Sequence, residues 1–99
     1  MLVHIVLFWL KDDLSPHQRS AFKAGLDSLT TIESATAVYV GSPAATLKRP
    51  VIDNSYDYCL TVIAPDVAAH DAYQVDPRHQ AFITRFKQDW SQVKIYDAD

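Results

Sequence analysis

Residues 71–86 read Asp-Ala-Tyr-Gln-Val-Asp-Pro-Arg-His-Gln-Ala-Phe-Ile-Thr-Arg-Phe, and a single proline divides them. Pro77 lacks a backbone N–H and disfavours the helical conformation in the residue before it. A helix that ends near Gln74 should therefore be followed at once by a second helix. Asp76 is then a natural N-cap, with Pro77 at the first helical position.

The broken helix also decides where two polar aromatic side chains point. Tyr73 and His79 are six residues apart and would diverge on one continuous helix. A break between them can aim both into a common space, where a tyrosine and a histidine can carry acid–base chemistry. The alternative is a capped kink with an exposed histidine, which needs no function.

Residues 2–10 are apolar on both faces of a predicted strand. One face carries Val3, Ile5, Leu7 and Trp9, and the other carries His4, Val6, Phe8 and Leu10. If helices cover only one face of the sheet, a second copy of the chain is an economical cover for the other. We expect the copy to cover the face with Val6, Phe8 and Leu10, and His4 to point into the space enclosed there.

A capping box predicts the first helix. Ser15 can cap it, Pro16 suits its first position, and Gln18 is the third residue of the box. Apolar residues then recur at helical spacing up to Thr30-Thr31, which indicates an amphipathic helix of about four turns. A shorter, alanine-rich helix should begin at Val67.

Alternation of side chains predicts the remaining strands over residues 34–40, 55–64 and 92–97. Tyr39 shares a face with small alanines, so we expect it to reach into the room they leave and to contact a ligand. Residues 41–54 are irregular, and loops of this length often act as lids or dimer arms.

The predicted order is strand, helix, strand, strand, helix, strand, the split βαβ arrangement of ferredoxin-like folds. We therefore expect an α+β fold in a single domain over residues 1–99, with an antiparallel sheet and both helices on one face. Two such sheets packed across a two-fold axis would form a dimeric α+β barrel.

Composition excludes several classes of function. The net charge is −3 and the densest basic point is Lys48-Arg49, which argues against nucleic-acid binding. Cys59 is the only cysteine, so it forms no internal disulfide and no iron–sulfur site. The apolar segment 2–10 is too short to cross a bilayer and lacks signal-peptide features. We expect a soluble cytoplasmic protein without a membrane partner.

Metal binding is a weaker possibility at this stage. His4, Asp57, Asp76 and His79 are suitable ligand types, but no close-spaced pair such as His-x-x-x-His occurs among them. We expect no metal and no cofactor.

Three segments carry a resemblance to a known family: Val3-His4-Ile5-Val6-Leu7-Phe8, then Lys11-Asp12-Asp13-Leu14-Ser15 with Gln18, and Tyr73 to Phe82. Over essentially its whole length the chain resembles the Dabb family, the stress-responsive dimeric A/B barrel domains. The resemblance implies a homodimer and a ferredoxin-like fold. It does not imply one activity.

The chain is also similar to an enzyme relative, plant olivetolic acid cyclase, a cofactor-free polyketide cyclase. That similarity implies catalytic roles for Tyr73 and His79 and a pocket role for His4. Two positions depart from it, because Asp76 replaces a histidine before the motif proline and Leu26 replaces a pocket tyrosine. These departures argue against the same substrate.

We therefore expect a cofactor-free enzyme that performs aldol, cyclase or isomerase chemistry on a small carbonyl or polyketide-like compound. His79 would be the base and Tyr73 the oxyanion donor, while His4, Tyr39 and Asp76 would contact the ligand. One alternative is a non-catalytic dimeric domain that binds a small hydrophobic molecule or protects against stress. Another is a cofactor-independent monooxygenase of a neighbouring dimeric α+β barrel family.

Overall fold

The helices and strands follow one another in the predicted order. The computed structural model describes residues 1–99. Its elements are β1 (Leu2–Leu10), α1 (Pro16–Ser28), the 3₁₀ helix η1 (Leu29–Thr31), β2 (Ala37–Gly41), β3 (Tyr58–Ala64), α2 (Val67–Val75), α3 (Pro77–Phe86) and β4 (Trp90–Ala98). The predicted second helix is therefore the pair α2 and α3.

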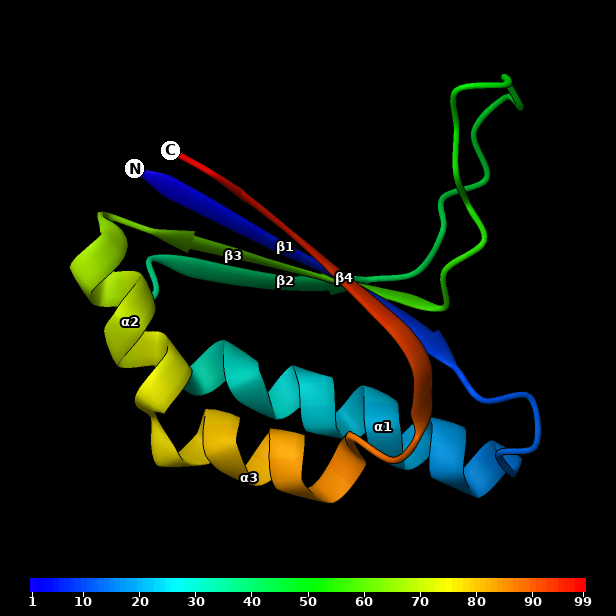
Figure 1. Cartoon of the computed structure of the whole chain (residues 1–99), viewed down its shortest axis with the longest axis horizontal. Coiled ribbons are helices and arrows are strands. Elements are labelled where there is room, and N and C mark those ends of the chain that lie inside the picture. The colour runs from blue at the N-terminus through cyan, green and yellow to red at the C-terminus, as the bar shows by residue number, and fades with distance from the viewer.

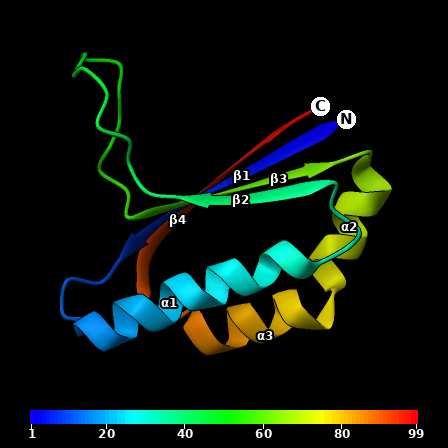
Figure 2. The ribbon, with the colours of Figure 1, turned by 180° about the vertical axis from the view of Figure 1, so that it is seen from behind.

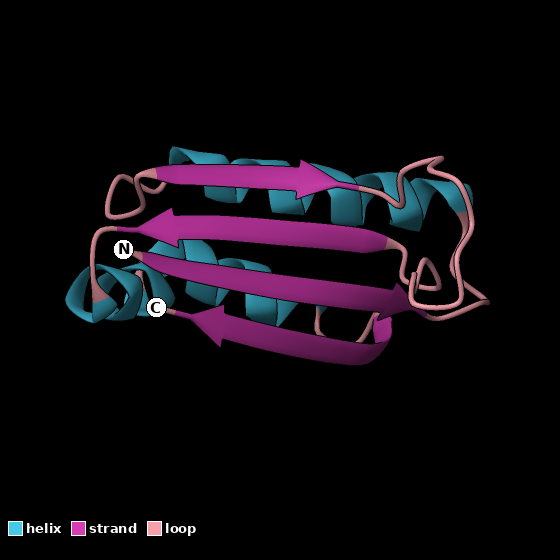
Figure 3. Cartoon of the chain, turned by 90° about the horizontal axis from the view of Figure 1, so that it is seen from above, coloured by secondary structure: helices cyan, strands magenta, loops and turns pink.

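The four strands form one antiparallel sheet in the order β2-β3-β1-β4. Helices α1 and α3 run side by side beneath one face of this sheet, and α2 stands at one end (Figure 1, Figure 2). Seen from above, the opposite face of the sheet is not covered by any helix (Figure 3). This is the ferredoxin-like α+β fold that the sequence predicts.

Side-chain caps start all three α-helices where the sequence places them. The Ser15 hydroxyl accepts from the Gln18 backbone N–H at 3.1 Å, and the Gln18 side chain accepts from the Ser15 backbone N–H at 2.8 Å. Asp66 caps α2, and Asp76 caps α3 with Pro77 in its first turn. None of these helices combines the length and apolar character needed to cross a lipid bilayer.

Three strands begin at other residues than predicted. The turn after η1 continues to Ala35, so β2 begins at Ala37. Ser55 donates from its backbone N–H and its hydroxyl to Asp53 Oδ1, at 2.9 and 2.6 Å, and this turn delays β3 to Tyr58. Trp90 has helical spacing from Phe86 but starts β4 instead.

The face of β1 that the helices cover is the opposite of the one we expected. Val6, Phe8 and Leu10 are buried beneath the helices, together with His4. The uncovered face carries the other set, Val3, Ile5, Leu7 and Trp9, all of intermediate exposure. Strand alternation separates the two sets but does not say which one meets the helices. The expectation that a second copy covers Val6, Phe8 and Leu10 was therefore wrong.

The core lies between the sheet and the helices. It joins residues from every element except β2 and β4: Val6, Phe8, Leu10, Phe22, Leu26, Leu29, Ile32, Leu60, Val62, Tyr73, Phe82 and Phe86. The ring of Phe22 lies 5.3 Å from that of Phe8 and 5.5 Å from that of Phe86, measured between centroids. These aromatic contacts fix α1 and α3 against the sheet and leave room for a cavity beside them.

Candidate functional site

A cavity of about 120 Å³ lies between β1, β4 and the helices. Nine of its twelve lining residues are hydrophobic, and the polar ones are His4, Gln74 and His79. Ile83, Val93 and Ile95 line it and are themselves 36, 38 and 53% exposed. Since these three lie on α3 and β4, the cavity opens between α3 and the edge strand.

His79 reaches the cavity from the first turn of α3, just after the break at Pro77. Burial lowers the pKa of His79, and charge on His4 and, to a smaller extent, on His70 lowers it further. The Asp76 carboxylate and a hydrogen bond to the Gln74 backbone act in the opposite direction. The net effect is a histidine that is mostly neutral near pH 7. Its neutral ring can accept a proton.

Tyr73 lies directly behind His79 at the end of α2. Its ring centroid is 4.9 Å from that of His79 and 6.3 Å from that of His4. The residue is fully buried, and its hydroxyl has no hydrogen-bond partner. Burial raises the pKa of Tyr73 far above its ordinary value, so the phenol stays protonated and can donate a hydrogen bond.

His4 faces the same cavity from the middle of the sheet and is only 2% exposed. The register pairs His4 on β1 with Asp97 on β4, so both side chains point to the helix side. His4 Nδ1 lies 2.5 Å from Asp97 Oδ1. A carboxylate that accepts from Nδ1 orients the ring and leaves the other nitrogen available to a ligand.

Gln74 and His70 extend this polar group along α2. Gln74 Nε2 lies 3.4 Å from His4 Nε2 and 3.2 Å from His70 Nε2. His70 Nδ1 lies 3.2 Å from Asp71 Oδ1. A connected chain of polar side chains therefore runs from Asp97 on the edge strand to Asp71 on α2.

Sequence reasoning missed three of these residues, although signals for them exist. Asp97 is the charged member of an otherwise apolar strand face that includes Val93 and Ile95. His70 precedes Gln74 by four residues, the spacing that places two side chains on one face of a helix. The pairing of β4 with β1 places Asp97 beside His4, and alternation alone does not specify that pairing.

Two predicted ligand contacts are not brought to the cavity. Tyr39 is 63% exposed and pairs with Thr61 on the uncovered face of the sheet, away from His79. Asp76 does not line the cavity, because its carboxylate caps α3 and accepts from the Arg78 guanidinium at 2.9 and 3.0 Å. Asp57, considered above as a metal ligand, accepts from the Leu10 backbone N–H at 2.7 Å instead.

A wider groove of about 340 Å³ lies between α1 and α3. Small residues line it together with Arg78 and Arg85, and it contains no histidine or tyrosine. Arg78 is held by Asp76, and Arg85 lies over the Phe86 ring at 4.8 Å. The groove lacks a side chain that can exchange protons near neutral pH, so the smaller cavity is the candidate site.

Comparison with known proteins agrees with this architecture. The sequence model of the family described as Stress responsive A/B Barrel Domain, Dabb, matches residues 2–99. The chain belongs to the Dabb family. Among curated proteins, none matches it.

Several solved structures are similar to this Dabb chain. A Dabb protein with a ferredoxin-like fold from Mesorhizobium loti is 23% identical with a TM-score of 0.78, covering 99% of this chain and 94% of that one. A dimeric ferredoxin-like protein from Thermobifida fusca is 19% identical with a TM-score of 0.78, and the match covers 98% of this chain and 88% of that one. A hydroxynitrile lyase from Passiflora edulis is 19% identical with a TM-score of 0.77, and the match covers 98% of this chain and 90% of that one. At these identities the similarity shows the shared fold.

Proposed function

We propose that this Dabb protein is an enzyme whose own side chains perform acid–base chemistry on a small carbonyl compound bound in the cavity. The observation that supports this most is the arrangement of two complementary groups. A largely neutral histidine, His79, lines an apolar cavity and packs against a buried phenol, Tyr73, whose hydroxyl has no partner. Pairs of titratable groups with opposed pKa shifts are typical of acid–base sites.

The roles follow from the protonation states. His79 holds a hydrogen bond to the Gln74 backbone, which leaves its other ring nitrogen free to accept a proton. That proton comes from the carbon next to the substrate carbonyl, and an enolate forms. Tyr73 is fully buried and does not itself line the cavity, so its side chain or its neighbours must shift before the hydroxyl reaches the substrate. The protonated phenol would then donate to the enolate oxygen and stabilise it. His79 then returns the proton to the product.

The size of the cavity restricts the substrate. An apolar protein cavity of about 150 Å³ accommodates benzene, and this one measures about 120 Å³. The cavity can therefore enclose a compound no larger than benzene, whereas a long polyketide would have to extend out of its opening. The cavity therefore favours a small aldehyde, ketone or carbonyl adduct over the polyketide-like substrate.

The hydroxynitrile lyase from Passiflora edulis points to a related class of compound. Cleavage of a hydroxynitrile also begins when a base removes a proton, in that case from the hydroxyl, before cyanide leaves. The same base and hydrogen-bond donor can serve both reactions. Small hydroxynitriles therefore belong among the compounds to be tested.

The enzyme should work as a homodimer. The uncovered sheet face carries Val3, Ile5, Leu7 and Trp9 in its central strand, and half-exposed apolar rows of this kind mark interfaces between subunits. The Thermobifida fusca protein with this fold is dimeric. The loop over residues 42–57 rises from the same side of the sheet and would meet the second copy (Figure 1).

Proton exchange tests this function and does not require the natural substrate. Small ketones and aldehydes are incubated in D₂O with the protein, and loss of the proton next to the carbonyl is followed by NMR. We expect the protein to accelerate the exchange, and His79→Ala to reduce the acceleration strongly. His17→Ala is the matched control, because His17 is exposed at the start of α1. Equal exchange by His79→Ala and the unchanged protein would contradict the assignment of the base.

A non-catalytic binding domain is the second candidate, and the apolar lining of the cavity supports it. In that case small apolar compounds would raise the melting temperature of the protein without any exchange or turnover.

A further inference from the structure

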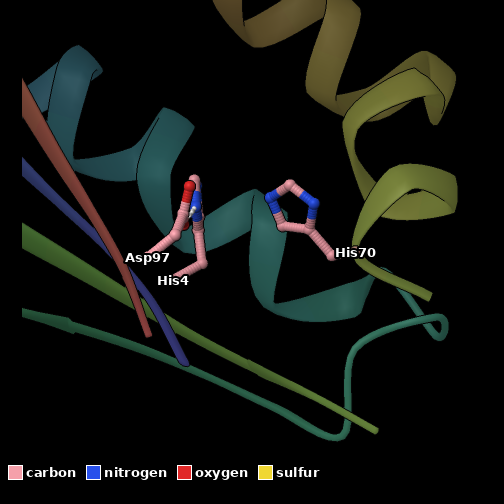
Figure 4. Close-up of side chains that lie close together, drawn as sticks. All are labelled: His4, His70 and Asp97. Carbon is pink, nitrogen blue, oxygen red and sulfur yellow. Dashed lines mark hydrogen bonds and ion pairs between the residues drawn. The ribbon is translucent and has the colours of Figure 1, made fainter. Parts of the chain in front are cut away.

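We propose that His4, His70 and Asp97 form a binding site for a divalent transition-metal ion of the zinc class, beside the cavity. Each offers one ligand atom, and these atoms all lie within 4.8 Å of one another. They come from β1, α2 and β4, and both His70 and Asp97 point toward His4 (Figure 4). The proposal replaces our expectation that no metal binds, which grouped His4 with Asp57, Asp76 and His79 and did not consider His70 or Asp97.

The types of ligand decide which ions fit. Two imidazole nitrogens and one carboxylate oxygen suit Zn²⁺ and neighbouring first-row ions, and this set also occurs in zinc sites with three protein ligands. Ca²⁺ and Mg²⁺ prefer sites made of oxygen atoms and would bind poorly here. A fourth coordination position would stay open, and it would face the cavity because His4 lines it.

The geometry needs only a modest adjustment. With bonds of about 2.0 to 2.1 Å, the ligand atoms of a tetrahedral zinc ion lie about 3.3 Å apart. The His4–Asp97 separation of 2.5 Å must therefore open, and the longest separation in the cluster, within 4.8 Å, must close. His4 is buried, but the side chains of His70 and Asp97 are 15 and 48% exposed and can rotate.

The surrounding residues already orient the ligands. Asp71 contacts His70 Nδ1, which leaves Nε2 of His70 directed at the cluster. The Gln74 amide lies 3.4 Å from His4 Nε2, which is the outer nitrogen of His4 when Nδ1 binds the ion. The same amide lies 3.2 Å from His70 Nε2 and must turn away from that atom when the ion binds. Carboxylates and amides that hold the outer nitrogen of a ligand histidine are regular parts of metal sites, and they strengthen binding.

Metal binding can be tested separately from the proposed acid–base chemistry. His79 and Tyr73 do not belong to the ligand set, and metal binding can be measured without any substrate. A protein that binds no metal would therefore not contradict the role of His79. Conversely, the proton-exchange assay can be run with a chelator present.

Titration of tag-free protein with Zn²⁺, in competition with a coloured chelator, tests the proposal. We expect one Zn²⁺ per chain, and a Co²⁺ complex whose visible absorption indicates four-coordinate geometry. His70→Ala should weaken Zn²⁺ binding by about 100-fold or more, and Asp97→Asn by about 10-fold or more. His17→Ala, which removes an exposed histidine remote from the cluster, should bind Zn²⁺ as the unchanged protein does.

Two results would overturn the proposal. One is that the unchanged protein binds no Zn²⁺ at micromolar concentration. The other is that the ligand substitutions have no specific effect: either His70→Ala and Asp97→Asn bind Zn²⁺ as tightly as the unchanged protein, or His17→Ala loses as much Zn²⁺ affinity as they do. Circular dichroism identifies any variant that fails to fold. The two substituted positions are partly exposed and lie on different elements. If one of the two variants fails to fold, the other therefore still tests the proposal.

Discussion

Tyr73 presents an unusual combination at the scale of a single residue. It is fully buried, and yet its hydroxyl makes no hydrogen bond. An unsatisfied buried polar group costs about 1–3 kcal/mol. Such a cost is tolerated where the group serves a function, and here the hydroxyl lies behind the proposed base.

Tyr73→Phe should therefore separate stability from activity. Removal of an unpaired hydroxyl is expected to leave the free energy of unfolding unchanged or to raise it by about 1 kcal/mol, while proton exchange slows. Urea unfolding and the NMR assay measure the two effects. A loss of stability of more than about 1 kcal/mol would mean that the hydroxyl has a structural partner.

The lowered pKa of His79 predicts the pH dependence of the reaction. Burial and charge on His4 and His70 oppose protonation of His79, and Asp76 only partly compensates. The neutral base is therefore present above a pKa that is lower than the ordinary value of about 6.5. In a pH series of kcat/KM with a chelator present, the acid limb should have its midpoint below about 6.5. A midpoint above that value would contradict the lowered pKa of His79.

The same shift affects stability. The unfolded chain binds a proton at His79 more tightly than the folded chain does. The free energy of unfolding therefore decreases as the pH falls below the pKa of His79 in the unfolded chain. This decrease stops once the pH is below the lowered pKa of His79 in the folded protein. His79→Gln should reduce this part of the pH dependence, which urea unfolding at a series of pH values measures.

The motif around Pro77 predicts that Tyr73 and His79 lie close together, and their ring centroids are 4.9 Å apart. The same reasoning missed Asp97, because its importance depends on the register between β4 and β1. It also misplaced Tyr39, since alternation in a short strand does not indicate which face meets the helices. Residues of one local motif are thus easier to predict than residues joined across the sheet.

At the scale of elements, the break between α2 and α3 positions the site. Asp76 caps α3 by accepting from the Arg78 backbone N–H at 2.8 Å, and the Arg78 guanidinium holds the pKa of Asp76 below its usual range. Ser15 caps α1 in a comparable way but lies away from the cavity. The two caps form a matched pair for mutagenesis.

Asp76→Ala and Ser15→Ala should each lower the free energy of unfolding by about 1 kcal/mol, because each removes an N-cap. Only Asp76→Ala should also slow proton exchange, because the first turn of α3 carries His79. Thermal unfolding and the exchange assay distinguish the effects. If both variants left exchange intact, the break would be a structural feature alone.

Helix starts could be read from the sequence because each depends on neighbouring residues, as in Ser15 with Gln18. Strand starts were less accurate. The Asp53–Ser55 turn and the pairing of Trp90 with Leu10 fix two of them, and neither follows from alternation. Capping residues thus predict the helix starts, while the strand starts depend on turns and on strand pairing that alternation does not reveal.

At the scale of the whole molecule, the uncovered sheet face is the proposed dimer interface. The sequence correctly predicts that β1 has two apolar faces, but we assigned the wrong one to the second copy. Ile5→Asp would place a charge in the middle of the uncovered face. We expect this variant to shift the homodimer toward monomer in sedimentation at low concentration, because an unpaired buried charge is costly.

Val75→Asp is the control for the assembly, because Val75 is 68% exposed at the end of α2 and does not lie on the sheet. It should leave the dimer intact. A folded monomer formed by the unchanged protein at micromolar concentration would contradict the predicted dimer.

In the proposed function, Tyr73 and His79 act together on a bound carbonyl compound. A double-mutant cycle tests it most directly, with proton exchange measured for the unchanged protein, Tyr73→Phe, His79→Ala and the double variant. Each single change should slow exchange, and the double variant should be no slower than His79→Ala, because the effects of residues that act as a unit are not additive. Additive effects, or a single variant as fast as the unchanged protein, would contradict it.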